Sequence, residues 1–156
     1  MNKTENKNLM VIPGEWNIRY EYAAGEITST FLQSLRDKKV ILASKCTKCS
    51  TVMLPPRAYC EKCFVKTEEL VEAGNEGVIE AATIITHKFE NFPEPPYAIA
   101  YVRLDGVKTA MVNFVHGVDL SDVKKASEEL KIGTRVKVEF KEEREGRVTD
   151  FYYRVK

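Results

Sequence analysis

Four cysteines in two closely spaced pairs are the residues of this sequence most suited to chemistry. Cys46 and Cys49 form one C-x-x-C pair, and Cys60 and Cys63 form a second pair after ten intervening residues. Each C-x-x-C turn places two sulfurs on one side of a tight loop, so two facing turns make a cage of four thiolates. Zinc accepts four cysteines in this tetrahedral geometry. The pattern therefore predicts that all four cysteines bind one zinc ion.

Other uses of the cysteine pairs make weaker hypotheses. Two disulfides fit the count, but the polar start M-N-K-T-E-N-K-N has no apolar run of a signal peptide, which favours a reducing, cytoplasmic location. A redox centre would need one activated pair rather than two adjacent pairs. The spacing does not distinguish zinc from iron. A closed cage leaves no coordination position for a substrate, so we expect a structural metal.

The ten residues between the pairs are fewer than the usual spacing of about 15 to 20. They suffice for a short hairpin, in which residues 51–54 leave the first pair and Ala58-Tyr59 return to the second. Pro55-Pro56-Arg57 would form its turn, because proline fixes φ and disfavours helix.

The composition describes a soluble globular protein of one ordinary domain or two small ones. The chain has 156 residues, of which 44% are hydrophobic and 30% charged, and it contains no apolar run long enough to span a bilayer. The net charge of +1 gives no overall attraction to nucleic acid or membranes, and the C-terminal half carries a slight acidic excess.

The N-terminal part is expected to hold a disordered tail over residues 1–10 and a helical segment with the zinc ribbon over 11–69. Trp16, Tyr20 and Tyr22 lie in an extended stretch, and we expect them to pack against the following helix rather than to form a ligand platform. That helix would begin with a cap at Thr28 or Ser29 and end near residue 37. A helix this short must pack on its own chain or on a partner.

Residues 70–156 are expected to form a five-stranded barrel of the OB-fold type. The pattern predicts three strands, then a helix over residues 121–130, then two more strands. The five strands are expected at residues 78–86, 97–104, 107–115, 135–140 and 147–155. The fold class is therefore mainly β, with a helix and a rubredoxin-like ribbon preceding the barrel.

The sequence offers no constellation of catalytic residues. Its two histidines, His87 and His116, each lie near the end of a predicted strand, where a surface or hydrogen-bonded role is the common one. No cysteine is left to act as a nucleophile, and no acid–base pair has a recognisable spacing. We therefore assign no catalytic residue and do not expect an enzyme.

Several motifs together resemble those of a known family of zinc-ribbon and OB-fold proteins, domain-of-unknown-function family thirty-five. They are the aromatic stretch ending at Gly25, the Phe31-Leu32 to Asp37 helix, the Cys46 to Cys63 cage around Pro55-Pro56-Arg57, and Ile132-Gly133 before the strand at residues 136–140. The resemblance covers nearly all of the chain after the first dozen residues and is strongest to archaeal members.

The resemblance implies a non-catalytic scaffold. Family members look like accessory partners of thiolase-type condensing enzymes, in archaea a thiolase and hydroxymethylglutaryl-CoA synthase, with the OB-fold associated with acyl-CoA. Only the four cysteines carry over as functional residues, and the residues that would contact CoA are unknown. We expect residues 16–37 and the ribbon to hold the partner enzyme.

The competing hypothesis is a nucleic-acid-binding protein, because OB-folds and zinc ribbons both serve that role. Its candidate contacts are three stacking aromatics and two cations, namely Phe89, Phe92, Tyr97, Lys88 and Arg103. The acidic excess of the barrel half disfavours this function, because a single-strand groove needs an electropositive track.

Overall fold

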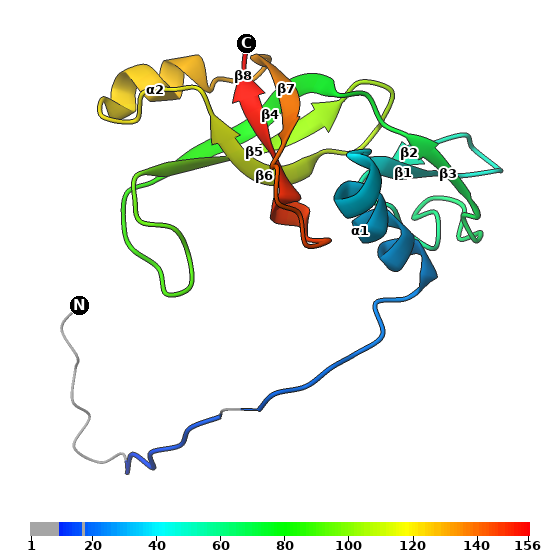
Figure 1. Ribbon diagram of the computed structural model, residues 1–156, viewed down its shortest axis with the longest axis horizontal. Helices are drawn as coiled ribbons and strands as arrows, with labels where there is room; N and C mark the ends of the chain where they lie inside the picture. The colour runs from blue at the N-terminus through cyan, green and yellow to red at the C-terminus, as the bar shows by residue number, and fades with distance from the viewer. Residues whose placement is uncertain (1–9, 17) are drawn as a thin grey trace.

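The computed structural model describes residues 10–16 and 18–156, so the tail expected over residues 1–10 lies outside the described residues except for Met10. A three-stranded ribbon sheet with one helix beside it adjoins a five-stranded barrel (Figure 1). The N-terminal elements are α1 (Glu26–Lys38), β1 (Leu42–Lys45), β2 (Val52–Met53) and β3 (Glu69–Glu72). The barrel elements are β4 (Glu76–Ile85), β5 (Tyr97–Leu104), β6 (Met111–His116), α2 (Val123–Glu129), β7 (Arg135–Phe140) and β8 (Phe151–Val155).

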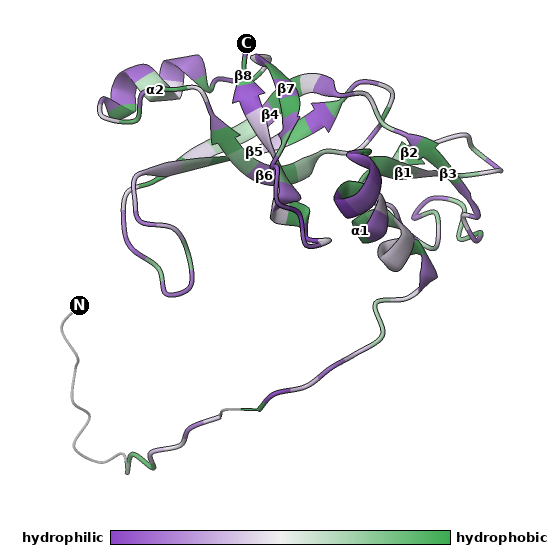
Figure 2. Ribbon diagram, viewed as in Figure 1, coloured by the Kyte–Doolittle hydropathy of each residue, from purple (hydrophilic) through white to green (hydrophobic). Residues whose placement is uncertain are grey.

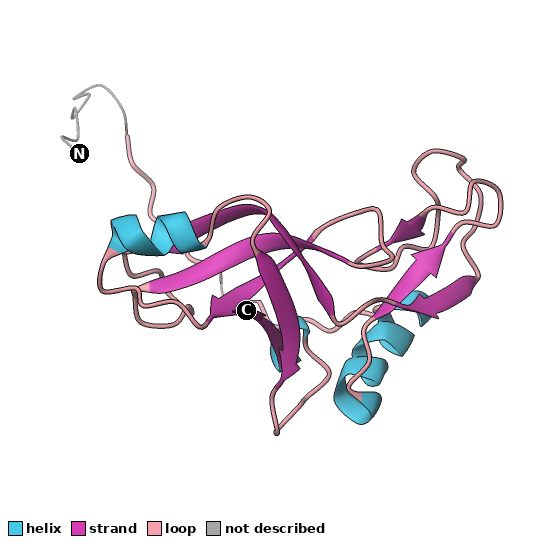
Figure 3. Cartoon of the chain, turned by 90° about the horizontal axis from the view of Figure 1, so that it is seen from above, coloured by secondary structure: helices cyan, strands magenta, loops and turns pink. Residues whose placement is uncertain are grey.

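The barrel has the strand order and direction of an OB-fold, as the sequence predicted. It is closed in the order β4-β5-β6-β8-β7, and the pair β6 and β8 is parallel while the other neighbours are antiparallel. The longest strands of the barrel are β4 with ten residues and β5 with eight. The view from above shows the barrel strands beside the ribbon sheet and its helix (Figure 3). The mainly β fold class is therefore confirmed. No helix of the described residues combines the length and apolar character needed to cross a membrane.

The ribbon sheet differs from the expected hairpin. β2 pairs antiparallel with β1, with Ser44 opposite Met53, and β1 pairs on its other side with β3. The expected partner of β2, the Ala58-Tyr59 return, instead makes a bridge from Tyr59 to Lys66. Proline lacks the N–H group that a ladder needs, so the two consecutive prolines end the strand instead of turning it into a hairpin. β3 crosses the boundary expected between residues 69 and 70, because it joins the ribbon sheet immediately before the barrel.

The apolar face of α1 is buried within its own chain. Phe31 is 2% exposed and Leu35 is fully buried, which decides the question that the sequence left open. The helix begins after Gly25, so the expected cap at Thr28 or Ser29 was wrong. Asp122 caps α2 by accepting hydrogen bonds from two backbone N–H groups.

The expected packing of the N-terminal aromatics on α1 was also wrong. Trp16, Tyr20 and Tyr22 are 87%, 77% and 80% exposed. The chain preceding α1 runs away from the folded body (Figure 1), and hydrophobic as well as hydrophilic residues lie along it (Figure 2). Phe31 and Leu35, the buried apolar residues of α1, pack into the core of the chain instead of against these aromatics.

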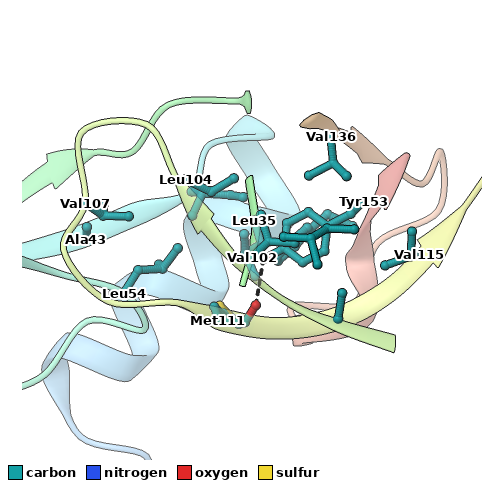
Figure 4. Close-up of a cluster of buried hydrophobic side chains, with 14 of the residues drawn as sticks. Leu35, Ala43, Leu54, Val102, Leu104, Val107, Met111, Val115, Val136 and Tyr153 are labelled. Atoms are coloured by element: carbon teal, nitrogen blue, oxygen red, sulfur yellow. Dashed lines mark hydrogen bonds between the residues drawn. The ribbon is translucent and has the colours of Figure 1, made fainter. Parts of the chain in front are cut away.

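One apolar core joins α1, the ribbon and the barrel (Figure 4). Leu35 of α1, Ala43 of β1 and Leu54 belong to the same buried cluster as Leu104 and Tyr153 of the barrel. The hydroxyl of Tyr153 donates a hydrogen bond of 3.1 Å to the carbonyl of Met111, which satisfies its polar atom inside the core. Because each half alone has few apolar residues, the shared core is what gives the small ribbon its stability.

Hydrogen bonds fix the ribbon on the barrel at Leu54. The hydroxyl of Thr109 accepts from the N–H of Leu54 and donates to the carbonyl of the same residue, both at 2.7 Å. Beside it, the N–H of Lys108 donates to the carbonyl of Val52 at 2.8 Å. One barrel side chain thus satisfies both backbone groups of a fully buried ribbon residue.

The loop between β7 and β8 contacts the C-terminal end of α1. The guanidinium of Arg144 donates to the Arg36 carbonyl at 2.9 Å, near the negative end of the helix. Asp150 organises this loop by accepting from the N–H groups of Glu145, Gly146 and Arg147 at 2.7 to 3.2 Å. Burial raises the pKa of Asp150, but these backbone donors outweigh it and leave the pKa below its ordinary value.

Replacing Thr109 with Val should destabilise the whole protein. The variant keeps the side-chain shape but leaves the buried N–H and C=O of Leu54 unpaired, which costs about 1–3 kcal/mol. We expect a single urea transition shifted to lower denaturant, because ribbon and barrel share a core. The control Thr30→Val changes an exposed helix residue and should alter stability by less than about 0.5 kcal/mol. Equal behaviour of the two variants would contradict the role of Thr109.

Replacing Asp150 with Asn should lower stability in a pH-dependent way. Because the folded-state pKa of Asp150 is depressed, its contribution is present above the unfolded-state pKa of about 4 and is lost as pH falls below it. Urea unfolding should separate wild type from Asp150→Asn by about 1–3 kcal/mol at pH 7, and this difference should shrink at pH 3. The exposed loop variant Glu90→Gln should show no such pH-dependent difference.

Candidate metal centre

Two backbone turns of the same construction present the four cysteines. In the first, the N–H of Cys46 donates to the carbonyl of Thr51, and the N–H of Ser50 donates back to the carbonyl of Cys46, both at 2.9 Å. In the second, Cys60 exchanges the same two bonds with Val65 and Phe64, again at 2.9 Å. Ser50 and Phe64 each follow the second cysteine and have left-handed φ values of 56° and 54°. The repeated geometry turns both sulfur pairs toward one point.

The sulfur positions fit a tetrahedral metal. All four Sγ atoms lie within 4.8 Å of one another, and those of Cys49 and Cys60 are 3.7 Å apart. Zinc–sulfur bonds of about 2.3 Å in a tetrahedron place the sulfurs about 3.8 Å apart. A disulfide would need about 2.05 Å, and all four cysteines are free. The predicted residues are therefore brought together, and the arrangement fits a structural zinc.

Burial and charge in the cage are uneven. The first cysteine of each pair, Cys46 and Cys60, is fully buried against Met53, whereas Cys49 is exposed and Cys63 half-buried. A hydrogen bond with Thr51 lowers the pKa of Cys49 to about 6, and the neighbouring Cys49 sulfur raises the pKa of Cys63 to about 12. Four sulfurs this close ionise together only beside a cation, a condition that a divalent metal meets.

The two histidines belong to different surroundings. His87 is exposed, with its Nδ1 atom 3.1 Å from the hydroxyl of Thr86. His116 lies at the end of β6 and packs edge-on against Tyr152, with ring centroids 4.5 Å apart. Partial burial, together with the positive charge of Arg154, lowers the pKa of His116. Among the described residues, neither histidine has a hydrogen-bonded carboxylate that would orient it as a general base.

The candidate nucleic-acid contacts do not form an electropositive track. The guanidinium of Arg103 donates to Glu80 at 2.6 Å, and Lys88 forms an ion pair with Glu94. Tyr97 packs against Phe114 with centroids 5.7 Å apart rather than standing free. Of the three candidate aromatics, Phe89 and Phe92 are well exposed, at 56% and 59%, and their rings contact each other edge to face. Because a carboxylate neutralises each of the two candidate cations, the structure weakens the nucleic-acid hypothesis.

The sequence analysis missed two features near the ribbon. Tyr59 and Phe64 are 61% and 83% exposed on the cysteine-bearing loops, so the ribbon end presents bare aromatic rings. The sequence signal for this exposed ring was that Phe64 directly follows the predicted metal ligand Cys63. A cavity of about 370 Å³ also lies between the segment that follows α1, the end of β3 and β7 of the barrel. Its lining comes from three separate segments, residues 39–41, residues 72–75, and Val138 with Phe140. Because these segments are far apart in the sequence, no local motif predicts the cavity.

Comparison with known proteins matches both halves of the chain. Residues 37–69 match the family model of the ChsH2 rubredoxin-like zinc ribbon domain, and residues 70–141 match that of the ChsH2 C-terminal OB-fold domain. A DUF35-family protein of unknown function from Sulfolobus solfataricus is 26% identical, with a TM-score of 0.61 over 85% of this chain and 87% of that one. The chain belongs to the ChsH2-type DUF35 family. The resemblance seen in the sequence motifs is therefore confirmed.

A second solved structure shares the DUF35 fold. It is named as an Ltp2–ChsH2 (DUF35) aldolase, is 21% identical, and gives a TM-score of 0.64 over 86% of this chain and 98% of that chain. No curated protein matches the sequence. At this level of identity the second structure supports the DUF35 fold of the present chain and nothing finer.

Replacing the buried Cys60 with Ser should remove the metal site. We expect the zinc content, measured by elemental analysis of purified protein, to fall from about one per chain to well below it. Thermal unfolding should shift to lower temperature, because metal binding to such a site contributes folding free energy. The control Lys62→Ala, on the same loop, should keep its zinc and its unfolding temperature. Full zinc occupancy in Cys60→Ser would contradict the four-cysteine site.

Proposed function

We propose that this chain is a non-catalytic accessory subunit that docks on a thiolase-type condensing enzyme and helps to hold an acyl-CoA thioester there. The observation that carries the proposal is the match of both the ribbon and the OB-fold to the ChsH2 family. A structure with the same fold is named as an Ltp2–ChsH2 (DUF35) aldolase, so its name joins a DUF35 protein to a second protein and to an enzyme activity. In its finer form, the proposal is that the chain bridges a thiolase and hydroxymethylglutaryl-CoA synthase.

The surface of the ribbon supports docking better than α1 does. The apolar side of α1 is used inside its own chain, so only its polar side is available to a partner. The ribbon end instead exposes Tyr59 and Phe64, and aromatic side chains of this kind often provide the central contacts of protein interfaces. The zinc cage would hold both rings in place, because each lies beside a metal ligand. Of the two elements expected to hold the partner, residues 16–37 and the ribbon, we therefore propose the ribbon end as the main contact.

Affinity purification of the tagged chain from its native host tests the proposal. We expect mass spectrometry to identify a thiolase-type enzyme, with about one zinc per accessory chain. Phe64→Ala should reduce the recovered enzyme at least about tenfold while keeping its zinc, whereas Phe92→Ala removes an exposed phenyl ring from a distant loop and should not.

Two results would contradict the proposal. Recovery of nucleic acid in place of a condensing enzyme would revive the competing function and overturn the accessory role. For the ligand, calorimetric titration of the purified complex with acetyl-CoA should give saturable heat, and the absence of any heat would remove acyl-CoA from the proposal.

A further inference from the structure

The segment preceding α1 has the pattern of a β-strand that lacks a sheet. In residues 16–22, here called the N-terminal arm, every second residue is apolar or aromatic: Trp16, Ile18, Tyr20 and Tyr22. Alternate side chains of an extended chain lie on the same face, and the rings of Tyr20 and Tyr22 lie 6.1 Å apart. These four side chains are 63% to 87% exposed. The arm therefore has the residue pattern of an amphipathic strand, and its own chain leaves these four side chains uncovered.

A second uncovered apolar surface lies on the barrel. A groove of about 200 Å³, here called the outer groove, lies across β4, β5 and β6 and is lined almost entirely by apolar atoms. Register places Ala81, Tyr101 and Val112 in one row across the three strands. Tyr101 and Val112 are 53% and 41% exposed. The groove is thus wide open on a face that the ribbon and α1 do not cover.

The half of β4 beside this groove also has a free edge. Residues 81–85 of β4 pair with β5 on one side, while β7 pairs only with residues 76–78 of β4. Among the described strands, none pairs with the outer side of residues 81–85. An extended segment could therefore add alongside β4 and place alternate side chains over the groove, as in other cases of strand addition.

We propose that the N-terminal arm of one copy docks in the outer groove of a second copy, and that two copies exchange arms reciprocally. The dimensions agree, because an apolar cavity of about 150 Å³ already accepts benzene and the groove is about 200 Å³. Trp16 is the anchoring side chain, since it is the largest and most exposed of the four. This dimer is independent of the proposed accessory function.

Buried area favours a second copy as the occupant. Three aromatic side chains and one isoleucine bury about 500 Å², so one arm and its groove together bury about 1,000 Å², which is the lower limit for a stable interface. A reciprocal exchange doubles this to about 2,000 Å², within the standard range. Charge does not oppose it, since the chain carries a net +1 and Arg103 beside the groove is neutralised by Glu80.

Trp16 is the only tryptophan, so its fluorescence reports directly on the arm. Sedimentation velocity of the full-length zinc-loaded chain should show a dimer that dissociates on dilution, and the tryptophan emission should shift to longer wavelength in parallel. Trp16→Ala and Val112→Glu should each weaken the dimer about 30-fold or more. The control Val123→Glu changes an equally exposed valine, 43% against 41%, on α2 and should leave the dimer unchanged.

A mixture of the two variants gives the sharpest test of exchange. Trp16→Ala retains an intact groove and Val112→Glu retains an intact arm, so a mixed pair regains one of the two contacts. The mixture should therefore associate more strongly than either variant alone.

Three outcomes would overturn the proposal. The first is a monomer at every concentration with solvent-exposed tryptophan. The second is a blue-shifted tryptophan in a monomer, which would place the arm on its own groove. The third is a dimer that neither variant weakens. A thermal unfolding transition, measured for each variant first, shows that the variant is folded before its dimerisation is compared with that of the wild type.

Discussion

The apolar core between α1, the ribbon and the barrel is the interaction on which the remaining structure depends. Leu35 of the helix and Leu54 of the ribbon are fully buried in the same cluster as Leu104 of the barrel. The ribbon by itself has only a small second cluster around Met53 and the two buried cysteines. A sheet of three short strands with so small a core is marginal alone. The barrel therefore stabilises the ribbon from one end, and a metal ion held by the four cysteines would stabilise it from the other.

This arrangement separates stability from function. Because the helix uses its apolar face inside the molecule, the uncovered apolar surfaces are found elsewhere among the described residues, including the aromatic ribbon end, the outer groove and the N-terminal arm. A cage with four cysteine ligands has no open position, so a metal there would organise the ribbon end rather than react. Such a molecule presents surfaces to other chains, in keeping with the accessory role that we propose for this DUF35-family member.

The electrostatics of the barrel agree with a protein-binding role. Arg135 contacts both Asp105 and Glu76, and Arg154 contacts Glu139, so several of its cations are paired with carboxylates on the same surface. Exposed pairs of this kind add little stability. They do neutralise the surface, and a neutral surface has no long-range attraction for phosphate backbones.

The sequence by itself determined the features that depend on local spacing. The two C-x-x-C pairs predicted a four-cysteine cage whose sulfurs the structure brings together. The alternation of Val136, Val138 and Phe140 predicted β7, and a run of β-branched residues predicted β4. Only the tertiary structure decided that β2 pairs with β1, that α1 buries Phe31 in its own chain, and that Trp16 is left exposed. These outcomes depend on which segments, distant in the sequence, pack against the same apolar residues. A local sequence pattern does not specify such long-range contacts.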